Sequence, residues 1–171
     1  ACARMMGASG TGTLGSFQFP IPDARMLTLI QRVTEARVDV DGECVGRIGR
    51  GLLALVGIEP GDGEPQVARM VERLLGYRVF ADEEGRMNRS LADTGGGLLL
   101  VSQFTLAADT RKGMRPGFST AAAPDAAEAV FGRLLAECRA RHGGAVETGR
   151  FGAHMAVALV NDGPVTILLR A

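Results

Sequence analysis

The sequence predicts a single α+β domain in which a mostly antiparallel β-sheet, curled or stacked on itself, is covered by two helices. Short apolar runs with strand-like alternation crowd both halves of the 171-residue chain. Two longer segments carry apolar residues at helical spacing, and hairpin-type turns join strands near both ends. A chain of this length can bury a sizeable core, which a hydrophobic content of 46% supports.

Composition narrows the class of protein. The formal net charge is +0, so a polyanionic partner must be held by a local basic patch rather than by a global field. No apolar stretch reaches the roughly 20 residues that cross a bilayer. The three cysteines are widely spaced and predict neither a disulfide framework nor a metal site. We therefore expect a soluble, cytoplasmic protein with free thiols, no membrane contact, no metal and no cofactor.

Residues 1–25 differ from the rest of the chain. They contain a run of small residues and a proline-containing stretch without periodicity, and they lack the continuous apolar segment of a signal peptide. We expect a flexible, partly disordered extension there, either native or added, and one domain over residues 26–171.

The predicted strands follow from alternation and turn signals. Residues 36–40 alternate apolar and charged side chains, Asp41-Gly42 is a hairpin signal, and residues 52–58 form an apolar central strand. Strands are predicted at 27–33, 36–40, 44–48, 52–58, 77–80, 98–101, 146–151, 155–160 and 165–169.

The two helices are predicted from apolar stripes and from their ends. Asp62 and Pro65 suit the start of the first helix and Gly76 its end, while the second starts at Pro124 and stops before Gly143. The stripes are Val67, Met70, Val71, Leu74 and Leu75 in the first helix, and Ala127, Val130, Phe131, Leu134, Leu135 and Cys138 in the second.

The motif Ser102-Gln103-Phe104-Thr105 follows an apolar strand and is the first candidate site. A Ser or Thr acts as a nucleophile only beside a base, and no histidine lies in or near this motif in the sequence. The ordinary interpretation is a strand end whose hydroxyls cap a turn. Alternatively, the Gln103 amide and the main-chain N–H groups of Phe104 and Thr105 polarise a carbonyl, as an oxyanion hole does.

The second candidate is Gly163-Pro164, which also follows an apolar run. A turn before the last strand is the ordinary interpretation. A cis peptide, which costs about 0.5–1 kcal/mol before proline, would point both carbonyls into a ligand pocket. Those oxygens would leave room for hydrogen on one face of a substrate Cα and would clash with a side chain there.

Basic residues are the remaining candidates. Arg32 is either a solvated residue of the first strand or a guanidinium that orients a carbonyl or carboxylate. Arg111, Lys112 and Arg115 lie in the irregular segment 107–123, and a loop of that length is more often functional than accidental. Beside a site, these three side chains would attract phosphate.

From Met26 to Ala171 the chain resembles the D-aminoacyl-tRNA deacylase family. The resemblance rests on several motifs that occur in order at family-like spacing. They are Gln31-Arg32-Val33, Gly76-Tyr77-Arg78-Val79-Phe80, Met87-Asn88, Ser102-Gln103-Phe104-Thr105-Leu106, Gly113-Met114-Arg115-Pro116 and Asn161-Asp162-Gly163-Pro164-Val165-Thr166.

This resemblance implies a proofreading hydrolase that cleaves the ester of D-aminoacyl-tRNA and also removes glycine mischarged on tRNA. It implies a homodimer with active sites at the subunit interface, where a cis Gly163-Pro164 peptide enters the partner's pocket and rejects L-amino acids. Arg32 would hold that peptide in orientation. The implied pocket residues are Ser102, Gln103, Phe104 and Thr105, with Phe151 or Met155 beside the adenine.

Three alternatives stay open at this point. The family is thought to use the 2′-hydroxyl of the tRNA to activate water, which fits a motif without histidine. The first alternative to this mechanism is that Thr105 acts as a covalent nucleophile. The chain can also be a tRNA-binding module of the same fold without turnover. A deacylase of relaxed chirality, with a trans Gly-Pro peptide, is the third alternative.

Overall fold

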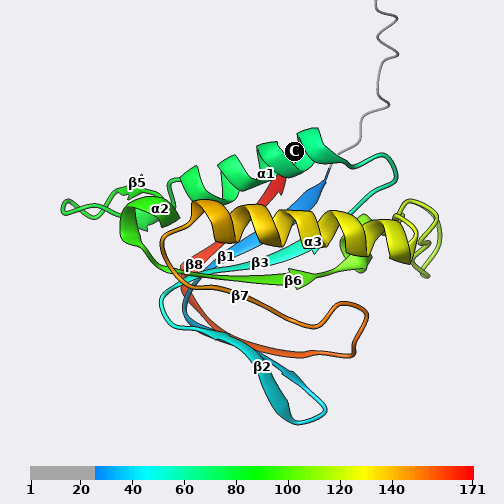
Figure 1. The fold of residues 1–171 in the computed structure, drawn as a ribbon, viewed down its shortest axis with the longest axis horizontal. Coiled ribbons are helices and arrows are strands. Elements are labelled where there is room, and N and C mark those ends of the chain that lie inside the picture. Colours follow the sequence, from blue (N-terminus) through cyan, green and yellow to red (C-terminus); the bar gives the residue numbers. More distant parts are fainter. Residues whose placement is uncertain (1–25) are drawn as a thin grey trace, which may run out of the picture.

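Two long helices lie side by side over one face of a six-stranded sheet in the computed structural model, which describes residues 26–171 (Figure 1). The extension predicted at residues 1–25 lies outside the described residues. The elements are β1 (Leu27–Val40), β2 (Glu43–Ile48), β3 (Gly51–Gly57), α1 (Glu64–Gly76), β4 (Phe80–Ala81), β5 (Met87–Arg89), α2 (Leu91–Thr94), β6 (Gly97–Ser102), the 3₁₀ turn η1 (Phe104–Ala107), α3 (Pro124–Arg141), β7 (Val146–Thr148) and β8 (Ala156–Arg170).

The sheet is mixed, with antiparallel pairs in the majority. Its strand order is β2-β1-β3-β6-β7, and β8 pairs with the other edge of β1. The partners of β1 are all antiparallel to it, whereas β3, β6 and β7 run parallel to one another. A parallel pair needs a crossover, and α1 lies in the one between β3 and β6. The predicted α+β class, with a mostly antiparallel sheet and two main helices, is confirmed.

The curl of the sheet comes from β1. Residues 27–33 of this strand pair with β3 and residues 36–40 pair with β2, so two successive strands share one edge of a single bent strand. Register shifts against β8 fall between Gln31 and Glu35, where the bend lies. The sequence predicted two strands here. The polar residues between the two predicted strands belong to one continuous strand, because β8 pairs with both halves of β1.

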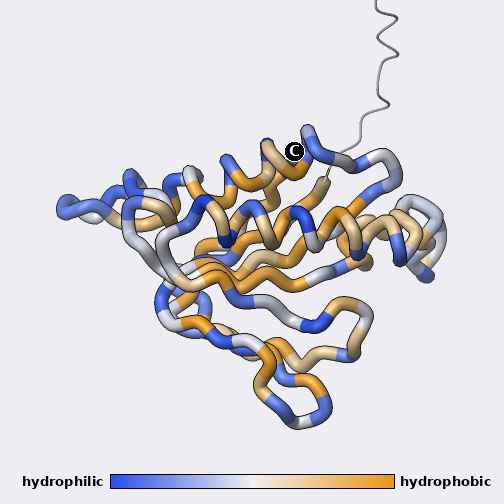
Figure 2. The backbone as a smooth tube through the Cα atoms, in the orientation of Figure 1, coloured by the Kyte–Doolittle hydropathy of each residue, from blue (hydrophilic) through white to orange (hydrophobic). Residues whose placement is uncertain are grey.

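Two cores result, one on each face of the central strands. Leu52 and Leu100 face the helices, while Leu53 and Leu99 face the inside of the curl. This alternation follows the two-residue period of a strand, and it explains why β3 and β6 are apolar on both faces (Figure 2). The predicted stripe of α1 is buried throughout, and Val130, Phe131, Leu134 and Cys138 of α3 are buried against it and the sheet.

The polar segment at residues 82–94, for which the sequence predicted neither strand nor helix, is partly ordered structure. It contains β5, which pairs with β4, and the short helix α2. Local side-chain bonds build it: Asp82 accepts from the backbone of Arg86 over 2.8 Å, and Asp93 accepts from the N–H of Ser90 over 2.8 Å. Such short-range bonding leaves no apolar period for sequence analysis to detect. The strand predicted at 77–80 is correspondingly reduced to Phe80 and Ala81 of β4.

The last strands also differ from the prediction. The strand expected at 146–151 ends at Thr148, and those expected at 155–160 and 165–169 are one strand, β8. Asn161 allows this continuity, because its Oδ1 accepts from the Val165 N–H over 2.8 Å. This hydrogen bond joins the two ends of the short segment that contains Gly163 and Pro164. The predicted turn is therefore a bulge within β8.

Candidate functional site

The carboxyl ends of β3 and β6 meet at one edge of the sheet because the two strands are parallel, with Val56 beside Ser102. The N–H of Gln103 then donates to the Val56 carbonyl over 2.7 Å, and the chain turns into η1. Gly57 permits this close approach, since a Cβ there would lie 2.9 Å from Cβ of Leu106. The predicted motif is therefore held against the end of the central strand.

Two main-chain donors are left at the start of η1. The N–H groups of Phe104 and Thr105 donate to no other group within residues 26–171, and both residues are exposed. The Gln103 side-chain amide donates over 2.5 Å to Thr105 Oγ1, so this hydroxyl is held by an amide rather than by a base. Adjacent free N–H groups suit an oxygen that carries negative charge.

A cavity of about 650 Å³ lies beside these donors. Ser102, Gln103 and Phe104 line it, and so do Phe151 and Met155, the two residues expected beside an adenine. Its other walls come from β3, β6, β8 and the loop before α3. The structure thus brings together two parts of the chain that the sequence analysis connected only through a family resemblance.

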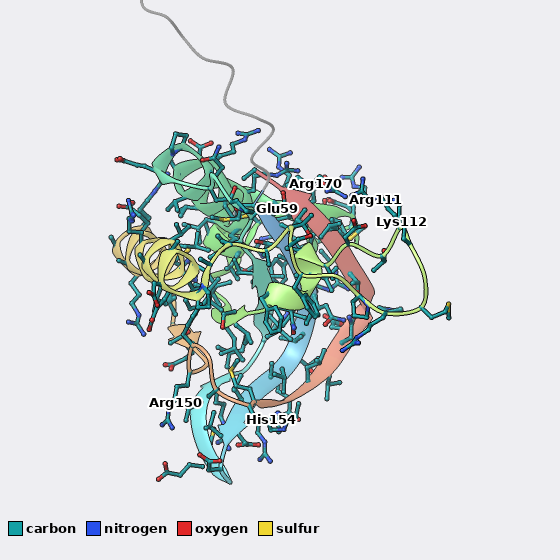
Figure 3. All side chains as sticks on the ribbon, turned by 90° about the vertical axis from the view of Figure 1, so that its right-hand side faces the viewer. Glu59, Arg111, Lys112, Arg150, His154 and Arg170 are labelled. Atoms are coloured by element: carbon teal, nitrogen blue, oxygen red, sulfur yellow. The ribbon has the colours of Figure 1, made fainter. Side chains whose placement is uncertain are left out.

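The cavity wall also differs from expectation in three residues. His154 lines the cavity, although no histidine lies near the motif along the chain. It stands on the same turn as Arg150, between β7 and β8 (Figure 3). Phe118, from the long loop, lines the cavity as well, whereas Thr105 is not among its lining residues.

Arg32 fixes the main chain in front of the Gly163-Pro164 dipeptide. Its Nε donates to the Asp162 carbonyl over 2.9 Å and lies 3.2 Å from Asp162 Oδ2, and its Nη1 donates to the Val79 carbonyl over 2.6 Å. The side chain is only 13% exposed. The geometry therefore matches the interpretation of Arg32 as a guanidinium that orients a carbonyl. It does not match the interpretation as a solvated surface residue.

The dipeptide itself faces outward. The Gly163-Pro164 peptide is cis, both residues are exposed, and neither lines the cavity of its own chain. Gly163 has φ of +142°, and a Cβ there would lie 2.8 Å from Val165 Cγ2 and 3.1 Å from Arg32 Nη2. Only glycine fits this position, and the dipeptide can serve a pocket only if that pocket belongs to another molecule.

The basic loop is less uniformly charged than its sequence suggests. Arg111 forms a two-pronged ion pair with Asp109, with both N–O distances at 2.8 Å. This side-chain hydrogen bonding holds the pKa of the Asp109 carboxyl well below its usual range. Lys112 and Arg115 form no ion pair or side-chain hydrogen bond with the part of the chain that is described. The uncompensated positive charge of this loop is therefore carried by Lys112, which Figure 3 labels, and by Arg115.

Two kinds of feature are absent from the part of the chain that the structure describes. Among residues 26–171, no group of three or more His, Cys, Asp or Glu side chains is placed to hold a metal ion. None of the helices described is long and apolar enough to cross a membrane.

Comparison with known proteins then decides the family. A family model described as D-Tyr-tRNA(Tyr) deacylase matches residues 29–170. The chain belongs to the D-aminoacyl-tRNA deacylase family. A D-aminoacyl-tRNA deacylase of Xanthomonas campestris pv. campestris (strain 8004) is 74% identical over 145 residues, which are 85% of this chain and 99% of the relative. One from Stenotrophomonas maltophilia (strain K279a) is 73% identical over the same shares. The predicted family and enzyme class are confirmed.

Solved structures agree on the fold. A c-Myc DNA Unwinding Element Binding Protein is 40% identical, with a TM-score of 0.82 over 85% of this chain and 99% of its own. A probable eukaryotic D-amino acid tRNA deacylase, 19% identical, matches 86% of this chain and 100% of its own with a TM-score of 0.76. The second likeness concerns the fold alone.

Proposed function

We propose that this chain hydrolyses the ester that joins a D-amino acid to the 3′ end of tRNA. The observation that carries the proposal is the pair of free N–H groups, of Phe104 and Thr105, beside a cavity of about 650 Å³. An ester carbonyl seated against them gains two hydrogen bonds that strengthen as its oxygen becomes negative. The family membership supplies the substrate class.

The reaction needs little acid–base catalysis from protein side chains. Water adds to the ester carbonyl, the bond to the ribose oxygen breaks, and that oxygen leaves as a hydroxyl with the proton taken from water. An aminoacyl ester is already activated, so positioning and oxyanion stabilisation can supply much of the rate. The neighbouring ribose hydroxyl of the tRNA activates the water in this proposal. Thr105 is a poor covalent nucleophile because its hydroxyl bonds to the Gln103 amide.

Selection against L-amino acids falls to Gly163 and Pro164. Their main-chain oxygens form a wall that admits hydrogen on one face of the substrate Cα and clashes with a side chain there. Arg32 supports this role by gripping the preceding carbonyl. Glycine has no side chain to meet the wall, so the proposal extends to glycine mischarged on tRNA.

In this proposal the wall comes from a second copy of the chain, because the dipeptide is exposed and does not line the cavity of its own chain. β8 supports such a contact. It pairs with β1 along one edge, no strand of the described residues pairs with the other edge, and Val160 and Leu168 are 50% and 41% exposed on it. An unpaired strand edge with apolar side chains favours association. We propose a cytoplasmic homodimer with each active site at the subunit interface.

Substitution of Pro164 tests the wall and the subunit interface together. Pro164→Ala is expected to lower the preference for D- over L-tyrosyl-tRNA or to weaken the dimer. An unchanged rate ratio together with an unchanged sedimentation mass would contradict both roles.

A second candidate function is binding to nucleic acid without turnover, which the name of one structural relative, a DNA Unwinding Element Binding Protein, favours. Incubation of D-tyrosyl-tRNA with trace protein separates the two functions. A deacylase releases many equivalents of D-tyrosine per chain. A binding module releases none, and complete protection of the ester under stoichiometric protein would overturn the proposed hydrolysis.

A further inference from the structure

Two phenylalanine rings form an exposed pair at the rim of the cavity. Phe104 is 59% and Phe118 is 43% exposed, their ring centroids lie 5.1 Å apart, and their planes are tilted by 57°. Both residues line the cavity. Because tilted rings do not cover each other, a ring face stays open to solvent. Large apolar side chains gathered at the mouth of a pocket mark a binding surface.

The loop that carries Phe118 is held in place before any ligand arrives. Asp109 and Gly117 exchange two backbone hydrogen bonds of 2.8 and 3.0 Å, which close the loop directly before Phe118. Beyond it, Thr120 Oγ1 donates to the Ala107 carbonyl, and the Ala122 N–H donates to the Ile58 carbonyl over 3.0 Å. A ring fixed on both sides loses little freedom when a ligand stacks on it.

The same loop supplies positive charge next to the rings. Lys112 and Arg115 lie at its exposed tip without an ion-pair partner in the described residues. Aromatic rings beside uncompensated cations are the combination that binds single-stranded nucleic acid, since bases stack on the rings and phosphates meet the cations. A purely apolar partner would not use these charges.

Another part of the cavity wall carries a second aromatic group. Phe151 packs on Phe131 of α3, with centroids 6.0 Å apart, and Met155 covers Gly149, where a Cβ would lie 2.5 Å from its sulfur. The family resemblance implies that this part of the wall lies beside the terminal adenine. The Phe104–Phe118 pair is therefore left for the next group along the substrate.

We propose that the Phe104–Phe118 pair stacks the base of the nucleotide that precedes the terminal adenosine in the single-stranded 3′ end of tRNA. The phosphate between the two nucleotides then lies on the side of Lys112 and Arg115. This inference rests on the proposed function and deepens it. It makes Phe118 a binding residue for the tRNA end and gives the enzyme a way to favour tRNA over smaller D-amino acid esters.

The test compares two substrates on variants of Phe118. One is D-tyrosyl-adenosine and the other is the same ester on the trinucleotide CpCpA. We expect Phe118→Ala to lower kcat/KM for the trinucleotide about tenfold, within the range of one stacked base, and to lower kcat/KM for the adenosine ester much less. Phe118→Tyr, which keeps the ring, is expected to match the wild type. Phe118→Leu keeps apolar volume without a ring and answers the question if the alanine variant does not fold.

Met114→Ala is the matched control, because Met114 is fully exposed on the same loop and is expected to change neither substrate. Equal losses on both substrates would overturn the inference, since the ring would then shape the adenosine site. No loss on either would also overturn it, as would dissociation of the dimer in the variants. Failure of the proposed function itself looks different, because the wild type would then hydrolyse neither ester.

Discussion

Removal of Arg32 is the most demanding test of how the dipeptide is held. The side chain makes two charge-assisted hydrogen bonds to carbonyls, at 2.9 Å to Asp162 and 2.6 Å to Val79, and is 13% exposed. At about 1.5 kcal/mol for each such bond, Arg32→Ala is expected to lower the free energy of unfolding by about 3 kcal/mol. Arg32→Lys keeps the charge but not the planar fork, so we expect a loss of about half that size.

Urea unfolding at one fixed protein concentration measures this loss, because the stability of an oligomer depends on concentration. The rates on D- and L-tyrosyl-tRNA, measured on the same samples, report the orientation of the dipeptide. Arg37→Ala is the control on the same strand: its ion pair with Asp39 spans 3.0 Å, but the arginine side chain is 52% exposed, so we expect a change below about 1 kcal/mol. If Arg32→Ala matched this control in stability and in D/L ratio, the argument that Arg32 orients the dipeptide would be refuted.

Four further outcomes follow from the site and the core. Thr105→Ala is expected to keep most of the activity, and complete loss in a folded variant would make Thr105 the nucleophile. His154→Gln is expected to retain turnover of D-tyrosyl-tRNA, while loss of turnover at unchanged KM would assign a base to the cavity. Lys112→Ala and Arg115→Ala should each flatten the salt dependence of KM by about one phosphate contact; slopes equal to that of the wild type would argue against tRNA binding there. Burial raises the pKa of the Cys138 thiol to about 12, so iodoacetamide should leave it unmodified in the native protein, as mass spectrometry can check.

Local periodicity made much of the fold predictable. The stripes of α1 and α3 and the apolar strands β3 and β6 depend on side-chain burial that repeats along the sequence. The parallel pairing of β3 with β6 and the continuity of β8 were not predictable in the same way. Both depend on contacts between segments far apart in the chain, and the second also on one Asn161 side chain that bonds to Val165.

The residues of the candidate site fall into the same two groups: those predictable from the local sequence and those that depend on tertiary contacts. Ser102, Gln103 and Phe104 could be selected because polar residues directly follow an apolar strand. His154 and Phe118 were missed because their approach to that strand end is tertiary, and neither lies in a periodic segment. One signal was present for Phe118, namely an aromatic residue next to a basic loop, which is typical of nucleic-acid contacts. The sequence motifs did not predict the ion pair between Arg111 and Asp109.

We propose that a cavity at one strand end, completed by a dipeptide from a second copy, hydrolyses D-aminoacyl esters and rejects L-esters. Initial rates of D- and L-tyrosyl-tRNA hydrolysis, with enzyme far below substrate, measure this directly. We expect repeated turnover of the D-ester and a rate on the L-ester indistinguishable from spontaneous hydrolysis. Equal rates on the two enantiomers, or a single turnover followed by arrest, would contradict it.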